Sequence, residues 1–578
     1  MTKATRKSFN RGWVFQLDDS AAFAAPTLDD RAWRGVTLPH DWSAEEPLDE
    51  ANPAGCGGGY AKAGIGWYRK HFDFTPEMAG KVVRITFDGV YMDTDIYLNE
   101  QRIGGCGYGY SSFYVDLSPA LRDGDNVLAV RVNNSLQPNS RWYAGSGIYR
   151  NVWLEILENV HLAQWGIFAM TSQLYLDRQP TLAKLQINTN VDNDTDVRLH
   201  AEVFHTLQDA NGKELFSTGT AIQLDMHTSG EVMTTPVVES PHLWTCDDPY
   251  LYTLHTVVRV NGAIVDAAQT RIGIRTATFD CDQGFLLSGK PVKIKGMCVH
   301  HDCGLTGAVG LRESWLRRLR LLKDMGCNGI RCAHNPPTPE LLDLCDELGF
   351  FVMDEIFDEW MLTKDKIHNY YSQSLAYGSS QFFCRDAQKD LLTMLQRDRC
   401  HPSIVLWSIG NEIPEQATVE GVRLLHYLQD ICHREDPTRM VISACDNIAA
   451  AAPSTAFCEF VNALDVVGYN YVARWRERAE TLYDEDHKHF PQRRMIGSEN
   501  PSAGGARGDY ALQTGSASAF RNDYLRATMN HEFLWRYTMS RDFVAGDFLW
   551  TGIDYLGESE WPSKGSASGP IDTAGFPK

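Results

Sequence analysis

From about residue 281 onward, the chain alternates short apolar runs with segments whose apolar residues recur at helical spacing. Parallel strands joined by crossover helices show this pattern, because such strands are buried on both faces. Eight runs are strand candidates: Val292–His300, Gly329–Ala333, Phe350–Asp354, Ile404–Ser408, Met440–Ala444, Asp465–Tyr469, Met495–Ser498 and Asp547–Trp550. They predict a C-terminal (β/α)₈ TIM barrel over residues 281–578. Only seven helical segments accompany the runs before the sequence stops at Lys578, so we expect the barrel to lack its last helix.

The residues before the barrel have the pattern of short alternating strands. A chain of 578 residues is too long for one hydrophobic core, because single cores stop growing near about 250–300 residues. In residues 1–160 the alternation within Val82–Phe87, with its turn signals, predicts a jelly-roll β-sandwich. In residues 161–280 the alternation from Leu185 to Val191 predicts a smaller immunoglobulin-like β-sandwich. We therefore expect a multidomain protein with three domains.

The charge and the cysteine content exclude several classes of partner. The 54 Lys and Arg side chains against 74 Asp and Glu leave a formal charge of −20, which repels nucleic acid and anionic membranes. No run of 18 apolar residues and no apolar leader segment occurs, which predicts a cytoplasmic protein. The 14 cysteines contain no CxxC pair, so we expect reduced thiols and no zinc site.

Polar residues follow nearly every predicted barrel strand. The side chains at the C-terminal ends of barrel strands surround one bowl, where active sites of this fold lie. The residues at these ends include His300, Arg331, His334, Asp354, Glu355, Asn411, Glu412, Tyr471, Glu499 and Trp550. Structural roles compete with this interpretation: the histidines could hold loops, Trp550 could be barrel packing, and Glu499 could cap a helix. The role of Asp354 and Glu355 stays open, with a network that orients Arg331 as one alternative.

Two glutamates stand out among these residues. Glu412 follows Trp407-Ser-Ile-Gly410-Asn411, and Glu499 lies in Gly497-Ser-Glu-Asn500, at the ends of two different strands. Two carboxyl groups that face one cleft are what cleavage of a glycosidic bond requires. The pair therefore predicts a glycosidase.

At these residues the chain resembles glycoside hydrolase family 2, which contains β-galactosidases, β-glucuronidases and β-mannosidases. In the N-terminal part the resemblance lies in Leu38-Pro-His-Asp-Trp42, Gly66-Trp-Tyr-Arg-Lys70, Phe87-Asp-Gly-Val90, Tyr97-Leu-Asn99 and Gly145-Ser-Gly-Ile-Tyr-Arg150. In the barrel it lies in Lys295-Gly-Met-Cys-Val-His-His301, Asn328-Gly-Ile-Arg-Cys-Ala-His334, Trp407-Ser-Ile-Gly-Asn-Glu412, Gly497-Ser-Glu499 and Phe548-Leu-Trp-Thr-Gly-Ile-Asp-Tyr555. The likeness covers essentially the whole chain.

The resemblance implies a role for each matching position. Glu412 matches the acid/base of the family and Glu499 its nucleophile, while Asn411 matches a residue that binds the sugar 2-hydroxyl. Further positions match residues that hold the terminal sugar or steady the nucleophile: His300, Arg331, His334, Tyr471 and Trp550. The match of Tyr471 could instead fall on Tyr469, one strand step away. Asn139 stands where some relatives place an Asp near the sugar and a sodium ion.

One departure concerns metal binding. Large members of the family hold a magnesium ion near the acid/base with a Glu and a His two residues apart, and here the matching stretch reads Glu359-Trp-Met361. The His is missing, so we predict that no metal and no cofactor is needed. Family members often assemble through their sandwich domains, so a homo-oligomer is compatible with the resemblance.

These features together predict a retaining exo-β-glycosidase that hydrolyses terminal β-D-galactosides by double displacement. The expected arrangement holds Glu499 ionised, through donors such as Arg331 or Tyr471, while the charge of Glu499 raises the pKa of Glu412. Two alternatives remain. One is a β-glucuronidase or β-galacturonidase, although the Asn-x-Lys triplet of family glucuronidases is absent after Glu499. The other is an inactive carbohydrate-binding protein, if the barrel cannot close without its last helix.

Overall fold

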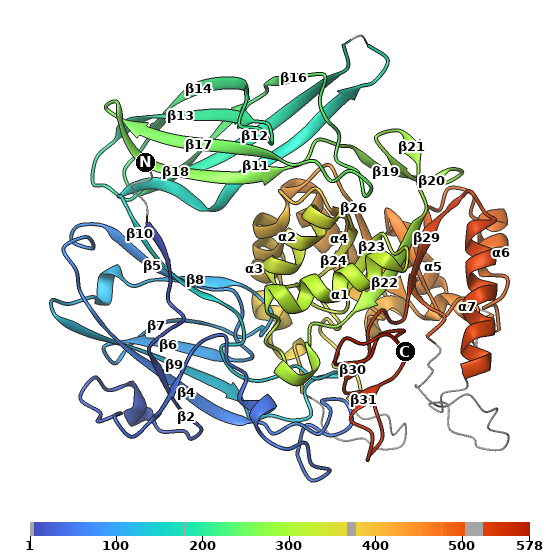
Figure 1. Cartoon of the computed structure of the whole chain (residues 1–578), viewed down its shortest axis with the longest axis horizontal. Helices are drawn as coiled ribbons and strands as arrows, with labels where there is room; N and C mark the ends of the chain where they lie inside the picture. Colours follow the sequence, from blue (N-terminus) through green and yellow to red (C-terminus); the bar gives the residue numbers. More distant parts are fainter. Residues whose placement is uncertain (1–4, 179, 367–376, 452–453, 475–476, 503–523) are drawn as a thin grey trace.

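The computed structural model describes residues 5–178, 180–366, 377–451, 454–474, 477–502 and 524–578. Its N-terminal part is a β-sandwich, drawn in blue in Figure 1. A six-stranded sheet has the order β3 (Arg34–Val36), β2 (Trp13–Gln16), β4 (Gly64–Asp73), β9 (Asp125–Asn134), β6 (Thr94–Leu98) and β7 (Gln101–Cys106). A four-stranded sheet has the order β1 (Thr5–Ser8), β10 (Val152–Leu157), β5 (Val82–Phe87) and β8 (Phe113–Asp116). Apolar side chains from both sheets, among them Ile85 and Val130, form its core.

A second sandwich lies at the top of Figure 1. One sheet contains β11 (Val160–Tyr175), β12 (Leu182–Asn193), β15 (Thr228–Thr234) and β16 (Val237–Glu239). The other has the order β14 (Glu214–Leu224), β13 (Leu199–Gln208), β17 (Tyr252–Val260) and β18 (Ala263–Ile272). Every second residue of β12 is buried, as the alternation from Leu185 to Val191 predicts. Short strands β19 (Ala277–Asp280), β20 (Gly284–Leu287) and β21 (Lys290–Pro291) then lead into the barrel.

The C-terminal part is a closed barrel of eight parallel strands. The strands are β22 (Ile294–Val299), β23 (Gly329–Cys332), β24 (Phe351–Glu355), β25 (Ile404–Asn411), β26 (Met440–Cys445), β27 (Val466–Asn470), β28 (Met495–Asn500) and β29 (Val544–Leu549). β22 pairs with β29, with Gly296 opposite Phe548. A Cβ on Gly296 would lie 2.2 Å from the Phe548 ring, so glycine leaves the space that this ring fills.

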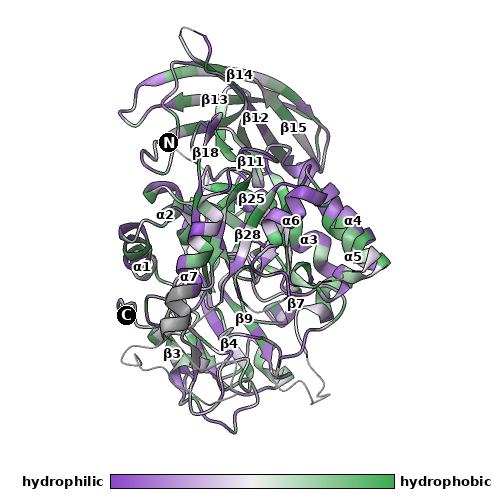
Figure 2. Ribbon diagram, turned by 90° about the vertical axis from the view of Figure 1, so that its right-hand side faces the viewer, coloured by the Kyte–Doolittle hydropathy of each residue, from purple (hydrophilic) through white to green (hydrophobic). Residues whose placement is uncertain are grey.

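In the part of the chain that the structure describes, seven α-helices cover the barrel, one after each of the first seven strands. They are α1 (Arg312–Asp324), α2 (Pro339–Leu348), α3 (Ser380–Asp398), α4 (Val419–Glu435), α5 (Thr455–Ala463), α6 (Leu482–His489) and α7 (Tyr524–Met539). Residues 550–578 contain the short strands β30 (Tyr555–Leu556) and β31 (Gly565–Ser566) and no α-helix. The barrel therefore closes without an eighth helix. The colours of Figure 2 alternate along α4 and α5, as expected for helices with one buried face.

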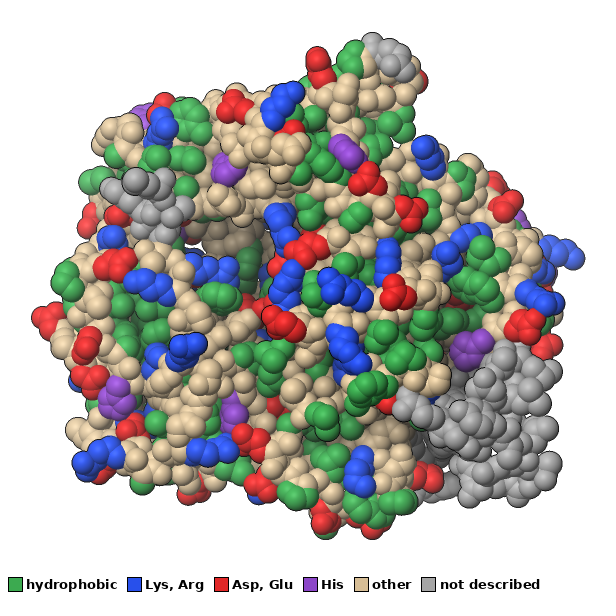
Figure 3. Space-filling view, viewed as in Figure 1, with side chains coloured by type: hydrophobic (Ala, Val, Ile, Leu, Met, Phe, Trp, Pro, Cys, Tyr) green, Lys and Arg blue, Asp and Glu red, His purple; other side chains and the backbone are tan. Residues whose placement is uncertain are grey.

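The two sandwiches contact different parts of the barrel. From the first, Arg150 donates to the Pro336 carbonyl (2.7 Å) and Ser111 donates to Asp390 (2.7 Å), beside the C-terminal ends of the strands. From the second, Trp244 donates to the Asp346 carbonyl at the end of α2 (3.0 Å). On the face drawn in Figure 3, acidic and basic side chains are interspersed, and a hollow lies below the second sandwich. None of the helices in the described ranges is long and apolar enough to cross a membrane.

Candidate active site

The C-terminal ends of the barrel strands bring Glu412 and Glu499 into one buried site. Glu412 comes directly after β25, and Glu499 lies in β28, where it is opposite Asn470 of β27. The Asn470 amide donates to Glu412 Oε1 (2.9 Å), so this side chain lies beside both acids. Glu412 has a φ of 45°, in the left-handed region that non-glycine residues rarely adopt. Such strain persists where the surroundings hold it, and the bond from Glu412 N–H to the Ala444 carbonyl (2.8 Å) contributes.

A fully buried arginine holds Glu499. Arg331 Nη1 donates to Glu499 Oε2 (3.0 Å), and its Nη2 donates to Asn411 Oδ1 (2.8 Å). Glu355 accepts from the same guanidinium at 3.0 Å through both oxygens and lies 2.7 Å from His334 Nδ1. Glu355 therefore orients Arg331, which was one of the alternatives left open for it.

The pKa values of the two acids are shifted in opposite directions. Burial and the charge of Glu412 raise the pKa of Glu499 to about 8, against the lowering effect of Arg331. Burial also acts to raise the pKa of Glu412, but Lys364 and Arg141 outweigh it and lower this pKa. These directions are opposite to the expected order, in which Glu499 is ionised and Glu412 is protonated. The pKa of Glu412 is lowered by Lys364 and Arg141, and neither of these residues lies at the end of a barrel strand.

Aromatic rings form one wall beside this pair. The Trp550 ring stacks on the His334 ring (5.3 Å, 5°) and meets the His300 ring edge-on (5.1 Å). Trp142, from the first sandwich, lies 5.1 Å from His300. Burial lowers the pKa of His300 well below its usual range. Both of its ring nitrogens are buried without a hydrogen-bond partner in the described part of the chain, which leaves them available to a ligand.

The structure separates the two candidate tyrosines. Tyr471 is hydrogen-bonded to Glu412, and burial together with the charges of Glu412 and Glu499 raises the pKa of Tyr471 well above its usual value. The Tyr469 hydroxyl donates to Asp486 (2.9 Å), on α6. Tyr471 is thus the tyrosine of the site.

Asn139 does not reach the carboxyl pair through its amide. Its Nδ2 donates to Asn134 Oδ1 (2.7 Å) and to the Leu136 carbonyl (2.9 Å), and its Oδ1 accepts from Tyr91 (3.2 Å). The amide is occupied within the first sandwich. Two residues later, Arg141 leaves that sandwich and binds Asp358 through two hydrogen bonds (3.0 and 2.8 Å).

Several residues near the carboxyl pair lie outside the predicted set. They are Arg141, Trp142, Asp358, Lys364, Asn470, Tyr555 and Glu558. The position of Asn470 within Tyr469-Asn470-Tyr471 at a strand end was a usable signal. Arg141 and Lys364 carry no such signal, because they come from another domain and from a loop.

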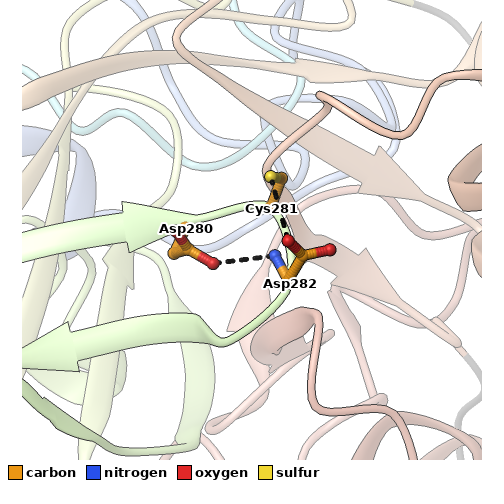
Figure 4. A group of neighbouring side chains, drawn as sticks. All are labelled: Asp280, Cys281 and Asp282. Atoms are coloured by element: carbon orange, nitrogen blue, oxygen red, sulfur yellow. Dashed lines mark hydrogen bonds between the residues drawn. The ribbon is translucent and has the colours of Figure 1, made fainter.

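The residues around Glu359 do not fit a divalent ion. Glu359 Oε2 accepts from the Lys364 backbone N–H (2.9 Å) and pairs with the Lys366 ammonium (2.5 Å), and its Oε1 accepts from the Ser380 N–H (3.1 Å). Met361 stands where a His ligand is required. One other group of possible ligands, Asp280, Cys281 and Asp282, occupies the turn between β19 and β20 (Figure 4). There the Asp280 carboxylate accepts from backbone N–H groups of its own turn (2.8 Å), so it has a local structural role.

Comparisons with known proteins agree with this architecture. Models of glycosyl hydrolases family 2 match the chain in three parts: the sugar binding domain over residues 7–157, the family 2 domain over 167–275 and the TIM barrel domain over 281–562. Fold and matches define a glycoside hydrolase. The chain belongs to glycoside hydrolase family 2.

Curated relatives carry two different activities in their names. A β-galactosidase of Bacteroides ovatus is 38% identical over 99% of this chain and 71% of its own length. A putative β-glucuronidase of Formosa agariphila is 32% identical over 99% of this chain, which spans only 54% of that relative.

Solved structures show the same overall architecture. A family 2 member from Bacteroides cellulosilyticus has a TM-score of 0.87 at 32% identity and covers 99% of this chain, which covers 70% of that protein. A β-glucuronidase of Bacteroides uniformis has a TM-score of 0.85 at 25% identity and covers 100% of this chain, which covers 68% of that protein.

Proposed function

We propose that the chain is a retaining exo-β-glycosidase in which Glu499 attacks the sugar and Glu412 handles the proton. The supporting observation is that Glu412 and Glu499 lie at the ends of β25 and β28, where Asn470 binds Glu412 and Arg331 binds Glu499, and that burial and the charge of Glu412 raise the pKa of Glu499. In the first step, the Glu499 carboxylate forms a bond to the anomeric carbon while the bond between that carbon and the leaving oxygen breaks. Glu412 gives its proton to the leaving oxygen. This step requires that Glu412 carries the proton, and that Glu499 is ionised, when the substrate is bound.

The rest of the candidate set forms the proposed sugar site. Asn411, His300, His334, Tyr471 and Trp550 line it, and Arg331 holds the nucleophile. One face of Trp550 is covered by His334, so stacking on the sugar would use its other face. Asn139 supports the site only through the chain segment that leads to Arg141. We also propose domain limits at residues 160 and 280 and activity without metals or cofactors. We further propose a cytoplasmic location, which agrees with fourteen free cysteines, because thiols stay reduced in that compartment.

We propose terminal β-D-galactosides as the substrates. A uronic acid needs a cation to receive its carboxylate. Among the described residues, three cations around the carboxyl pair already have acidic partners: Arg331 pairs with Glu355 and Glu499, while Arg141 and Lys364 pair with Asp358. The β-galactosidase of Bacteroides ovatus supports this choice. The β-glucuronidases among the relatives keep a uronide as the second candidate.

Parallel assays of aryl β-D-galactoside, glucuronide, galacturonide and mannoside decide between these sugars. We expect kcat/KM for the galactoside to exceed that for each uronide by about 100-fold or more, since an unpaired buried carboxylate costs several kcal/mol. Faster cleavage of a uronide would assign the second candidate. The absence of any cleavage would favour the carbohydrate-binding alternative.

A further inference from the structure

Two cations from separate parts of the chain meet at one buried aspartate next to the site. Asp358, which is 5% exposed, accepts from Arg141 of the first sandwich and, at 2.8 Å, from the ammonium of Lys364, in the loop after β24. Asp358 Oδ1 also accepts from the Asn411 amide (2.9 Å). The charge of one aspartate is thus shared by two cations and the residue before Glu412.

Lys364 also touches the peptide that carries Glu412. Its ammonium donates to the Asn411 carbonyl (2.7 Å), and its side chain is only 10% exposed. Arg141 reaches further to Glu558 at 3.4 Å, a weaker contact than its pair with Asp358. In a buried site such charges act on a neighbouring carboxyl with little screening by solvent. Both cations therefore favour the ionised form of Glu412.

This preference matters most in the second half of the proposed reaction. Once Glu499 is bound to the sugar as an ester, it has no charge. Glu412 must then be ionised, because it has to take a proton from the attacking water. Burial alone opposes an ionised carboxyl, so a cation nearby is needed at this stage.

Resting on the function proposed above, we propose that Lys364 and Arg141, joined through Asp358, are positioning residues that hold Glu412 ready to act as the base. In this step a water oxygen bonds to the anomeric carbon and its proton passes to the Glu412 carboxylate. The bond between the anomeric carbon and Glu499 breaks, and Glu499 leaves as a carboxylate. The positive charge near Glu412 thus comes from the protein's own side chains. Glu359 is paired with Lys366 and does not bind a metal ion that could supply this charge.

Lys364→Met and Arg141→Met test this proposal with the full-length enzyme. The substrate is the 2,4-dinitrophenyl β-glycoside of the sugar that the wild type cleaves fastest, since a good leaving group makes hydrolysis of the glycosyl-enzyme limit kcat. We expect kcat near pH 6 to fall about tenfold or more and its acid limb to move up by about one pH unit, while kcat/KM changes by less than about threefold. Mass spectrometry should show more glycosyl-enzyme at steady state than in the wild type.

Two controls separate this role from a structural one. Arg397→Met removes another buried arginine that links α3 to the first sandwich through Ser112 (2.9 Å), and it should leave the acid limb in place even if it lowers the Tm. Lys364→Arg keeps the charge and should restore most of kcat.

An unmoved acid limb in both Met variants, with kcat and kcat/KM falling together, would overturn the proposal. A wild type that forms no glycosyl-enzyme at all would instead overturn the function on which it rests.

Discussion

Glu412 accepts a hydrogen bond from the Asn470 amide, and the Lys364 ammonium binds the carbonyl of the preceding residue, Asn411. The roles of Glu412 as acid and as base can be separated by the choice of substrate. Glu412→Ala removes the proton donor, so we expect kcat/KM for a substrate with a poor leaving group to fall about 10³-fold, and much less for a dinitrophenyl glycoside. Added azide should restore turnover of the activated substrate. Steady-state assays of both substrates check this, and equal losses on the two would contradict the acid role.

The raised pKa of Glu499 predicts how activity falls on the alkaline side of the pH profile. Burial and Glu412 raise the pKa of Glu499 to about 8, so the pair keeps one proton below that pH and loses it above. Without a proton for the leaving oxygen, kcat/KM should fall as the pH rises through about 8. Glu412→Gln takes away the neighbouring charge and should remove this limb for an activated substrate. An alkaline limb that persists unchanged in Glu412→Gln would mean that another group titrates there.

At the residue scale, the sequence predicts which groups lie at the strand ends, but it does not predict which charged residues from elsewhere in the chain surround them. Glu412, Glu499 and Arg331 follow apolar runs that are easy to recognise, so their convergence could be predicted. The loop residues Asp358 and Lys364 could not be placed, because Asp358 binds Arg141 of another domain and Lys364 binds the Asn411 carbonyl, and both contacts are between residues far apart in the chain. The cations that lower the pKa of Glu412 could not be predicted for that reason.

At the scale of elements, the apolar pattern predicts all eight barrel strands, with ends that differ by up to three residues. β29 begins at Val544 rather than Asp547, since the residues before the predicted run are also buried. From the short stretch after the eighth run we expected no helix there, and residues 550–578 contain no α-helix. Local patterning carries these predictions, whereas contacts between the domains leave no periodic trace in the sequence.

The end of α2 offers a stability test that does not involve the active site. Gly349 has a φ of 74°, and a Cβ there would lie 2.3 Å from the Cys246 carbonyl of the second sandwich. Gly349→Ala should therefore lower the free energy of unfolding by about 1–3 kcal/mol, through backbone strain and the displaced neighbour. Denaturant titration measures this, with Gly326→Ala as a control, since Gly326 also has a positive φ (90°) but no atom within 4 Å of its Cβ position. Equal losses in both variants would show that the contact with Cys246 adds nothing.

For the whole molecule, the first sandwich completes the site that the barrel strands begin. Arg141 and Trp142 enter the rim from that sandwich, so the arrangement around Glu412 depends on how the two parts pack. The ring of eight strands is closed in the described residues, which argues against the alternative of a barrel that cannot close.

The whole enzyme should work without a divalent ion. Lys366 and the Ser380 N–H occupy Glu359, and Met361 offers no imidazole, so the full-length protein should keep its rate within about twofold after dialysis against EDTA. Rates measured with and without added Mg²⁺ check this. A rate that falls on chelation and returns with Mg²⁺ would contradict it.

Covalent attachment of a sugar to Glu499 is the defining event of the proposed mechanism, and it can be measured. Incubation with an activated 2-deoxy-2-fluoro-β-glycoside of the preferred sugar slows the second step, so the glycosyl-enzyme accumulates and can be digested and mapped by mass spectrometry. We expect one added glycosyl group, located on Glu499 and absent from Glu499→Gln. Attachment to another residue, or turnover with inversion at the anomeric carbon and no adduct, would contradict it.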